Sequence, residues 1–126
     1  MNTERRQFRR FLTDDRAFAC LRPDFGRLGK IKDISKGGLA FGYLSSDGLR
    51  EEPSEIDIFL SGDGFYLPNV PCSVVYDFKI GENFIPTSFL HDRCCGVEFG
   101  QLTEGQESKL QLFLSKYVTG AAQPPE

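Results

Sequence analysis

The apolar residues of this sequence occur in short segments, and this feature limits the fold more than any other. Between residues 16 and 99 every interval between apolar segments contains Gly, Pro, Asn or Asp, and the 126-residue chain carries 13 Gly and 7 Pro. Turn-forming residues at such spacing are typical of short β-strands and argue against a bundle of helices. We predict strands over 16–21, 26–34, 39–44, 56–60, 65–78, 84–90 and 94–99.

The segments 56–60 and 62–78 have features that indicate a half-buried strand, a turn and a bent strand. Ile56, Ile58 and Leu60 recur with the period of two that is expected for a strand with a buried face. The Gly-Asp-Gly sequence at 62–64 then predicts a hairpin turn. Two prolines interrupt the segment 65–78, which we therefore expect to be a long, bent strand.

One helix is predicted, near the C-terminus. Thr103 and Gln106 have the spacing of a capping box at a helix start. The apolar residues that follow recur at helical spacing: Leu110, Phe113, Leu114, Tyr117 and Val118. Gly120 is expected to end the helix. The apolar stripe of this helix must pack on an apolar surface, which a sheet or the end of a barrel would supply. Together with the many short strands, this predicts a mainly β protein, a small antiparallel β-barrel with one C-terminal α-helix.

The composition is that of one globular domain, with 40% hydrophobic and 26% charged residues. We expect residues 1–13 to form a flexible arginine-rich arm, residues 14–120 the barrel and helix, and residues 121–126 a disordered tail. No segment is apolar over the roughly 18 residues that a membrane helix needs, and no signal-peptide pattern is present. We therefore expect a cytoplasmic protein without membrane insertion.

The cysteine and histidine residues form no metal-binding pattern. Cys94 and Cys95 are adjacent, Cys20 and Cys72 are remote, and His91 is the single histidine, a spacing that matches no standard zinc site. We expect reduced thiols packed as small apolar groups, and neither a metal nor a cofactor. The sequence also presents no marked nucleophile or pair of catalytic carboxylates, so we assign no catalytic residue and do not expect an enzyme.

The first of two polar clusters is the segment 5–11, Arg-Arg-Gln-Phe-Arg-Arg-Phe, in which Arg6 and Arg10 form an Arg-x-x-x-Arg motif. Guanidinium groups are planar donors that match phosphate oxygens and the O6/N7 edge of guanine. Residues 1–36 hold ten Lys/Arg and five Asp/Glu, a net charge of +5, whereas residues 37–126 hold five and thirteen, a net charge of −8. A local positive region on an acidic body suits a small anion, although a solvated arm without a ligand has the same composition.

The second cluster is the segment 33–38, which has the form Asp-x-Ser-x-x-Gly between two predicted strands. On an extended segment, Asp33 and Ser35 are expected to point to the same face. A carboxylate can accept from the N1 and N2 donors of guanine, and a hydroxyl can bind phosphate, while Gly38 allows a turn or a close backbone approach. Alone, the same pattern is also compatible with an Asx-type turn.

Taken together and in this order, the motifs resemble the PilZ domain, the bacterial receptor module for cyclic di-GMP. The resemblance extends over roughly residues 4–118 and includes Arg6-x-x-x-Arg10, Asp33-x-Ser35-x-x-Gly38 and the strand 95–99 before the capped helix. It implies a six-stranded antiparallel split barrel that binds cyclic di-GMP without catalysis and switches conformation to regulate an effector protein. Such receptors act in motility or biofilm regulation, and the sequence does not identify the effector.

The resemblance also implies a role for each motif residue. Arg6 and Arg10 are expected to contact the guanine edges and phosphates, and Asp33 and Ser35 to hold a guanine and a phosphate from the barrel surface, with Gly38 shaping the turn. Arg5, directly before the first motif arginine, is typical of members that bind an intercalated ligand dimer. We therefore expect two ligand molecules per chain.

Two other non-catalytic functions are weighed against this hypothesis. A PilZ-like adaptor that acts on a protein partner and does not bind cyclic di-GMP is the main alternative, although every motif position is present here. A barrel that binds single-stranded nucleic acid is disfavoured, because the predicted strands after residue 36 are acidic and poor in lysine.

Overall fold

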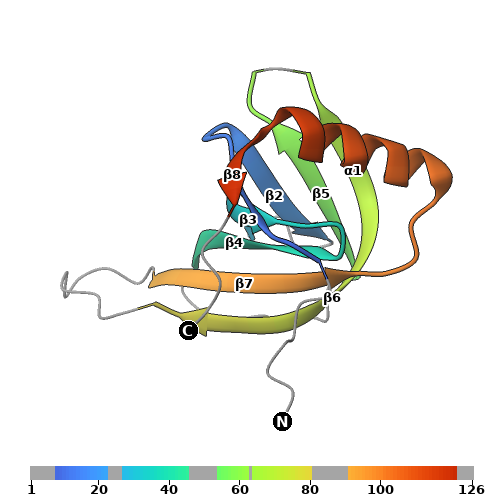
Figure 1. Ribbon diagram of the computed structural model, residues 1–126. Coiled ribbons are helices and arrows are strands. Elements are labelled where there is room, and N and C mark those ends of the chain that lie inside the picture. The colour runs from blue at the N-terminus through green and yellow to red at the C-terminus, as the bar shows by residue number, and fades with distance from the viewer. Residues whose placement is uncertain (1–7, 23–26, 46–53, 63, 81–90, 122–126) are drawn as a thin grey trace, which may run out of the picture.

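Six antiparallel strands of this chain close into a barrel, and a helix packs beside it (Figure 1). The computed structural model describes residues 8–22, 27–45, 54–62, 64–80 and 91–121. Within these residues the elements are β1 (Phe11–Thr13), β2 (Ala17–Arg22), β3 (Leu28–Ile34), β4 (Gly38–Ser45), β5 (Glu55–Leu60), β6 (Tyr66–Lys79), β7 (His91–Phe99), α1 (Glu104–Lys116) and β8 (Val118–Ala121).

The barrel closes because β3 pairs with both β2 and β4. Around the barrel the strand order is β2-β5-β6-β7-β4-β3, and the pairing of β2 with β3 completes the circle. Strand β6 is long enough to serve two neighbours: Tyr66–Pro71 pairs with β5, and Cys72–Lys79 pairs with β7. The predictions of a six-stranded antiparallel barrel and of a bent β6 are confirmed.

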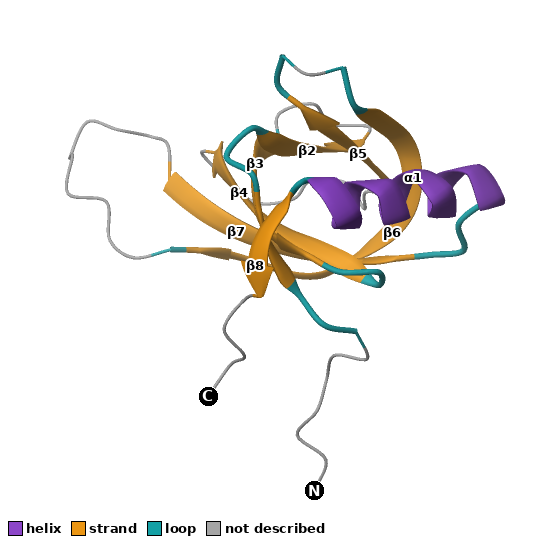
Figure 2. Cartoon of the chain, turned by 45° about the horizontal axis from the view of Figure 1, so that its top comes forward, coloured by secondary structure: helices purple, strands orange, loops and turns teal. Residues whose placement is uncertain are grey.

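Alternating residues of the strands fill the core. Buried side chains from every barrel strand meet there, among them Leu21, Ile34, Phe41, Ile58, Val70 and Val97. Helix α1 adds Leu110 and Phe113, and it packs against β6 and β8 (Figure 2). The predicted capping box is confirmed, because Gln106 N donates to Thr103 Oγ1 at 3.1 Å and the Gln106 side chain accepts from Thr103 N at 3.0 Å.

A polar cluster lies among the inward-facing residues near one end of the barrel. Tyr43 donates to one oxygen of the Asp77 carboxylate at 2.6 Å, and Arg93 Nε donates to the other at 3.0 Å. Asp77 is nearly buried, and Arg93 also donates to the Asp77 carbonyl. Burial, followed by the bond to Asp77, raises the pKa of Tyr43 to about 12. These groups satisfy one another, so we assign the cluster a structural role.

The two ends of the described chain differ from the sequence expectation. Phe11–Thr13, which we expected to belong to the arm, forms β1 and lies between β3 and β8. The helix ends at Lys116 rather than at Gly120, and Val118–Ala121 forms β8. The free edge of β1 explains both differences, because the residues after α1 satisfy its backbone groups. A strand of three residues is too short for a periodicity to be recognised.

Most predicted strand boundaries agree with the structure to within a few residues. An exception is the segment 91–93, expected to separate two strands, which forms the start of β7. The predicted strand over 84–90 lies outside the described residues. The hairpin turn after β5 is confirmed at Gly62 and Gly64, both of which have a φ of 78°.

Candidate functional site

The Asp-x-Ser-x-x-Gly motif forms the end of β3 and the tight turn into β4. Ser35 N donates to the Gly38 carbonyl at 2.8 Å, and Gly37 N donates to Ser35 Oγ at 3.0 Å. The backbone of Gly38 lies against β7, where an added Cβ would be 2.1 Å from the Val97 carbonyl oxygen. Only glycine therefore fits at the last motif position.

Ser35 differs from the expectation that it shares a face with Asp33. The strand ends at Ile34, so the alternation of side chains stops there. Ser35 is only 3% exposed and its hydroxyl is engaged within the turn. In this structure Ser35 shapes the turn, whereas Asp33 is partly exposed at the surface.

Arg10 reaches the motif from the segment before β1. Its Nη1 donates to Asp33 Oδ1 at 2.8 Å, with both side chains about four-fifths buried. Leu12 of β1 pairs with Asp33 of β3, and this pairing places Arg10, two residues before Leu12, close to Asp33. The buried Nε of Arg10 has no hydrogen-bond partner within the described residues. Two residues that the sequence assigned to one site therefore meet.

Phe8 makes a second contact between the arm and the motif. A Cβ added to Gly37 would be 2.8 Å from the Phe8 ring, so this ring packs directly on the turn. Phe8 lies between the two motif arginines in the sequence, and it fixes the chain just before Arg10. Arg5 and Arg6 lie outside the described residues.

The outer face of the barrel next to Asp33 is lined by small residues and ends in an aromatic ring. Across four strands, Asp33 of β3 is in register with Ala40 of β4, Gly96 of β7 and Tyr76 of β6. The Tyr76 ring lies over Gly96, where a Cβ would be 2.3 Å from Cε2. This row therefore combines a carboxylate, a guanidinium and an aromatic ring on one surface. Tyr76 is 39% exposed, and it also stacks on Phe78 with 5.4 Å between ring centroids.

The environment of Tyr76 keeps its phenol neutral. Partial burial raises the pKa of this hydroxyl, and the nearby Cys94 and Asp33 act in the same direction. A neutral phenol remains a hydrogen-bond donor over the physiological pH range.

The sequence motifs did not single out Tyr76 as a candidate site residue. A usable signal was the alternation of small residues in the predicted strand after the motif, Gly38-x-Ala40-x-Gly42, which leaves a strand face without large side chains. A large side chain from another strand can cover such a face. The pairing of the strands decides which aromatic residue does so, and the sequence alone does not show that pairing.

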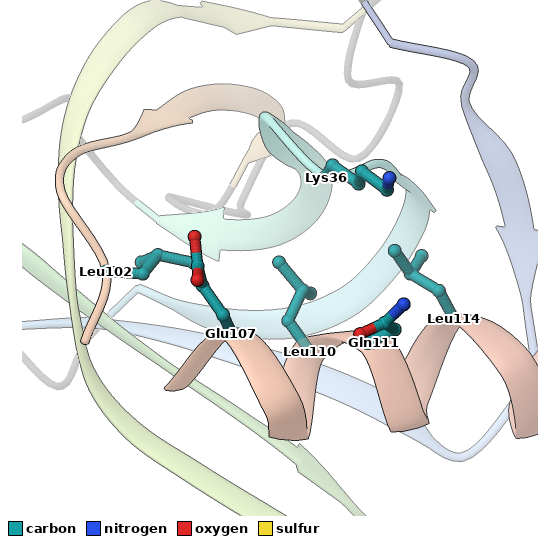
Figure 3. A pocket seen from close by; sticks show the side chains of 6 residues that line it. All are labelled: Lys36, Leu102, Glu107, Leu110, Gln111 and Leu114. Carbon is teal, nitrogen blue, oxygen red and sulfur yellow. The ribbon is translucent and has the colours of Figure 1, made fainter. Parts of the chain in front are cut away.

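A separate hollow of about 260 Å³ lies on the other side of the motif turn, between the turn and α1 (Figure 3). Its lining residues are Lys36, Leu102, Glu107, Leu110, Gln111 and Leu114. Lys36 belongs to the motif segment and lines this hollow across from α1 (Figure 3).

Across the part of the chain that the structure describes, no group of three or more His, Cys, Asp or Glu side chains could hold a metal ion. Among the same residues, α1 is neither long nor apolar enough to cross a bilayer.

The fold and the motif define a closed six-stranded barrel with a C-terminal helix and a polar surface at the β3–β4 turn. The sequence pattern of the PilZ domain matches residues 4–116. The chain belongs to the PilZ family, a family of cyclic di-GMP receptors that are generally non-catalytic. No curated protein is similar in sequence.

Two solved structures share the fold. The PilZ domain with c-di-GMP of YcgR from Escherichia coli has a TM-score of 0.60 and 12% identity, over 89% of this chain and 91% of that chain. The crystal structure of YcgR in complex with c-di-GMP, also from Escherichia coli, has a TM-score of 0.58 and 15% identity, over 89% of this chain and 45% of that one. At these identities the likeness concerns the fold.

Proposed function

We propose that this protein is a receptor for cyclic di-GMP and binds it on the outer face of β3, β4, β7 and β6. The observation that carries the proposal is the row in which the Arg10–Asp33 pair and Tyr76 lie in register across Ala40 and Gly96. A carboxylate can accept hydrogen bonds from the N1 and N2 donors of a guanine, and a guanidinium can bind the phosphate of the same nucleotide. An aromatic ring adds a stacking surface.

The proposed roles follow from the geometry of each residue. Asp33 accepts from the guanine edge, and Arg10 uses its remaining donors for a phosphate or the O6/N7 edge. Tyr76 supplies a ring for base stacking. Ser35 and Gly38 act by holding the turn. Arg6, four residues before Arg10, is proposed to contact the same ligand, and Arg5 is proposed to stack on a guanine of a second ligand molecule.

The proposed switch uses the connection between the arm and the C-terminus. Because β1 follows Arg10 directly and pairs with β8, a change in Arg10 on ligand binding can reach the end of α1. An effector protein that contacts this region would detect the change. We propose that the output is motility or biofilm regulation, and a cytoplasmic location stays a prediction.

Isothermal titration calorimetry with cyclic di-GMP tests the proposal. We expect saturable binding by the wild type, no binding by an Arg6→Ala/Arg10→Ala variant, and binding close to wild type by the matched control Arg9→Ala, because Arg9 is exposed. Two ligands per chain would support the role of Arg5. If the folded wild type produced no heat and showed no competition with a labelled ligand, the receptor function would be wrong and the adaptor function would replace it.

A further inference from the structure

A second row of side chains lies directly beside the Asp33–Tyr76 row on the same outer face. Phe78 of β6 is in register with Cys94 of β7, and Cys94 with Gly42 of β4. The Lys32 side chain lies over Gly42, where an added Cβ would be 3.7 Å from Lys32 Cε. This row therefore has a cation at one end, an aromatic ring at the other and small residues between them.

The two rows lie about 7 Å apart, which is the spacing of two residues along a strand, and each has a cation and an aromatic ring. Only the first row also has a carboxylate, that of Asp33. In the first row Arg10 supplies the cation and Tyr76 the ring. In the second row Lys32 supplies the cation and Phe78 the ring, which is 51% exposed. The two rings stack on each other, with 5.4 Å between centroids and an interplanar angle of 29°, so the two rows are in direct contact.

Exposed carboxylates limit this surface on both sides. Glu98 is paired with Gly38 beyond the first row, and Asp92 is paired with Leu44 beyond the second. Both acidic residues are exposed. A phosphate is repelled from the two ends and attracted to Lys32, and more weakly to Arg10, because Asp33 neutralises part of the Arg10 charge. The charge pattern thus matches an anion that lies between the two acidic ends.

We infer that the second row is a separate subsite for a purine nucleotide unit, in which Lys32 binds a phosphate and Phe78 stacks on a base. Cyclic di-GMP carries two guanines and two phosphates, so one molecule supplies a nucleotide unit to each row. This inference rests on the proposed function: the first row holds one guanylate and the second row holds the other guanylate of the same ligand.

The test measures the affinity for cyclic di-GMP of Phe78→Leu, which removes the ring and keeps an apolar side chain, and of Lys32→Gln, which removes the charge. Phe78→Leu is expected to weaken binding about tenfold, as the loss of one base-stacking contact does. Lys32→Gln is expected to weaken it by a similar factor, because it removes one charge-assisted contact to a phosphate. The double variant is expected to lose less than the product of the two single effects, because both residues hold one nucleotide unit.

Two variants provide matched controls. Tyr66→Leu removes another exposed ring from β6, and Lys30→Gln removes another exposed lysine from β3. Both lie outside the two rows, and we expect them to bind as the wild type does. A change in the controls as large as in the test variants would contradict the inference, because it would reflect general charge or surface effects.

The failure of the inference can be distinguished from the failure of the proposed function. If the wild type binds and Arg10→Ala does not, but Phe78→Leu and Lys32→Gln bind like the wild type, the second subsite is wrong and the receptor function stands. If the wild type does not bind, both are wrong. Lys32 is an exposed residue, so Lys32→Gln keeps the test valid even if Phe78→Leu is unstable.

Discussion

Arg10 and Asp33 form an ion pair of 2.8 Å that connects the arginine-rich segment to the end of β3. Both residues belong to motifs that the resemblance assigned to ligand binding. Each therefore satisfies part of the charge of the other. A ligand bound as proposed would have to share or replace this contact, which makes the pair a natural point at which such binding changes the arm.

Arg10→Ala is expected to change binding much more than stability. Each side chain keeps about a fifth of its surface exposed, so water still solvates part of the Asp33 carboxylate in the variant, and we expect a loss of about 1 kcal/mol in the free energy of unfolding. Urea unfolding of Arg10→Ala, with Arg9→Ala as the control, measures this difference. A loss of several kcal/mol would instead show that the pair mainly holds the fold together.

Gly96→Ala is expected to displace the Tyr76 ring and to leave the barrel intact. The new Cβ would be 2.3 Å from the ring, but the partly exposed ring can rotate outward. We expect the affinity for cyclic di-GMP to fall about as much as in Tyr76→Leu, roughly tenfold. Gly120→Ala, where an added Cβ meets no atom within 4 Å, is the control. Unchanged affinity in Gly96→Ala would remove Tyr76 from the site.

Asp77→Asn is expected to destabilise the barrel strongly. The nearly buried carboxylate accepts from both Tyr43 and Arg93, and loss of its charge leaves the Arg93 guanidinium without its counter-ion. We expect a decrease of about 3 kcal/mol in the free energy of unfolding. Asp92→Asn, at an exposed position of β7, serves as the control in the same urea titration. Equal effects of the two variants would contradict the structural role of the cluster.

Thr103→Ala is expected to lower the stability by about 1 kcal/mol, because it removes the side chain that caps α1. Ser108→Ala changes an exposed helical residue and is expected to have little effect. The comparison of their urea midpoints measures the contribution of the cap. A Thr103→Ala variant as stable as the wild type would show that packing of α1 on the barrel dominates.

The Cys72 thiol is expected to react only at high pH. Burial, together with the nearby Glu55, raises its pKa from an ordinary value of 9.0 to about 11. The thiolate is the reactive form, so at pH 9 the folded protein presents on the order of one Cys72 thiolate in a hundred molecules. Alkylation with iodoacetamide, followed by peptide mass spectrometry, is expected to show a midpoint near pH 11 in the folded state.

The raised pKa of Cys72 also makes the stability of the folded protein depend on pH. A thiol whose pKa is raised on folding stabilises the folded state fully below pH 9, and this contribution is lost as the pH rises toward 11. In urea-unfolded protein the alkylation midpoint should return to about pH 9. A midpoint near 9 in the folded protein would show that Cys72 is not desolvated as the structure indicates.

Local patterns in the sequence predicted much of the fold. The period of two in β5, the glycines of the β5–β6 turn and the capping box at Thr103 depend on nearby residues alone. The Arg-x-x-x-Arg and Asp-x-Ser-x-x-Gly motifs could be recognised for the same reason. Short-range rules apply there because the backbone geometry is set by residues that are close in the chain.

The pairing of strands that are distant in the chain could not be predicted from such local rules. Strands β1 and β8 are short, and each exists because the other, or β3, satisfies its backbone groups. The register that aligns Tyr76 with Asp33 depends on irregularities at Ile31/Asp33 and Val74/Tyr76. Because a shift of one residue moves every side chain to the other face, alternation in the sequence alone could not reveal which residues share the surface.

The sequence by itself determined the class of structure and the residues of the two motifs, since turn residues, periodicity and caps act locally. The tertiary structure decided which side chains meet: Arg10 with Asp33, Phe8 with Gly37, and Tyr76 and Phe78 with the small residues of β4 and β7. The physical reason is that the proposed binding surface is assembled from strands distant in the chain, and their register is set by the barrel as a whole.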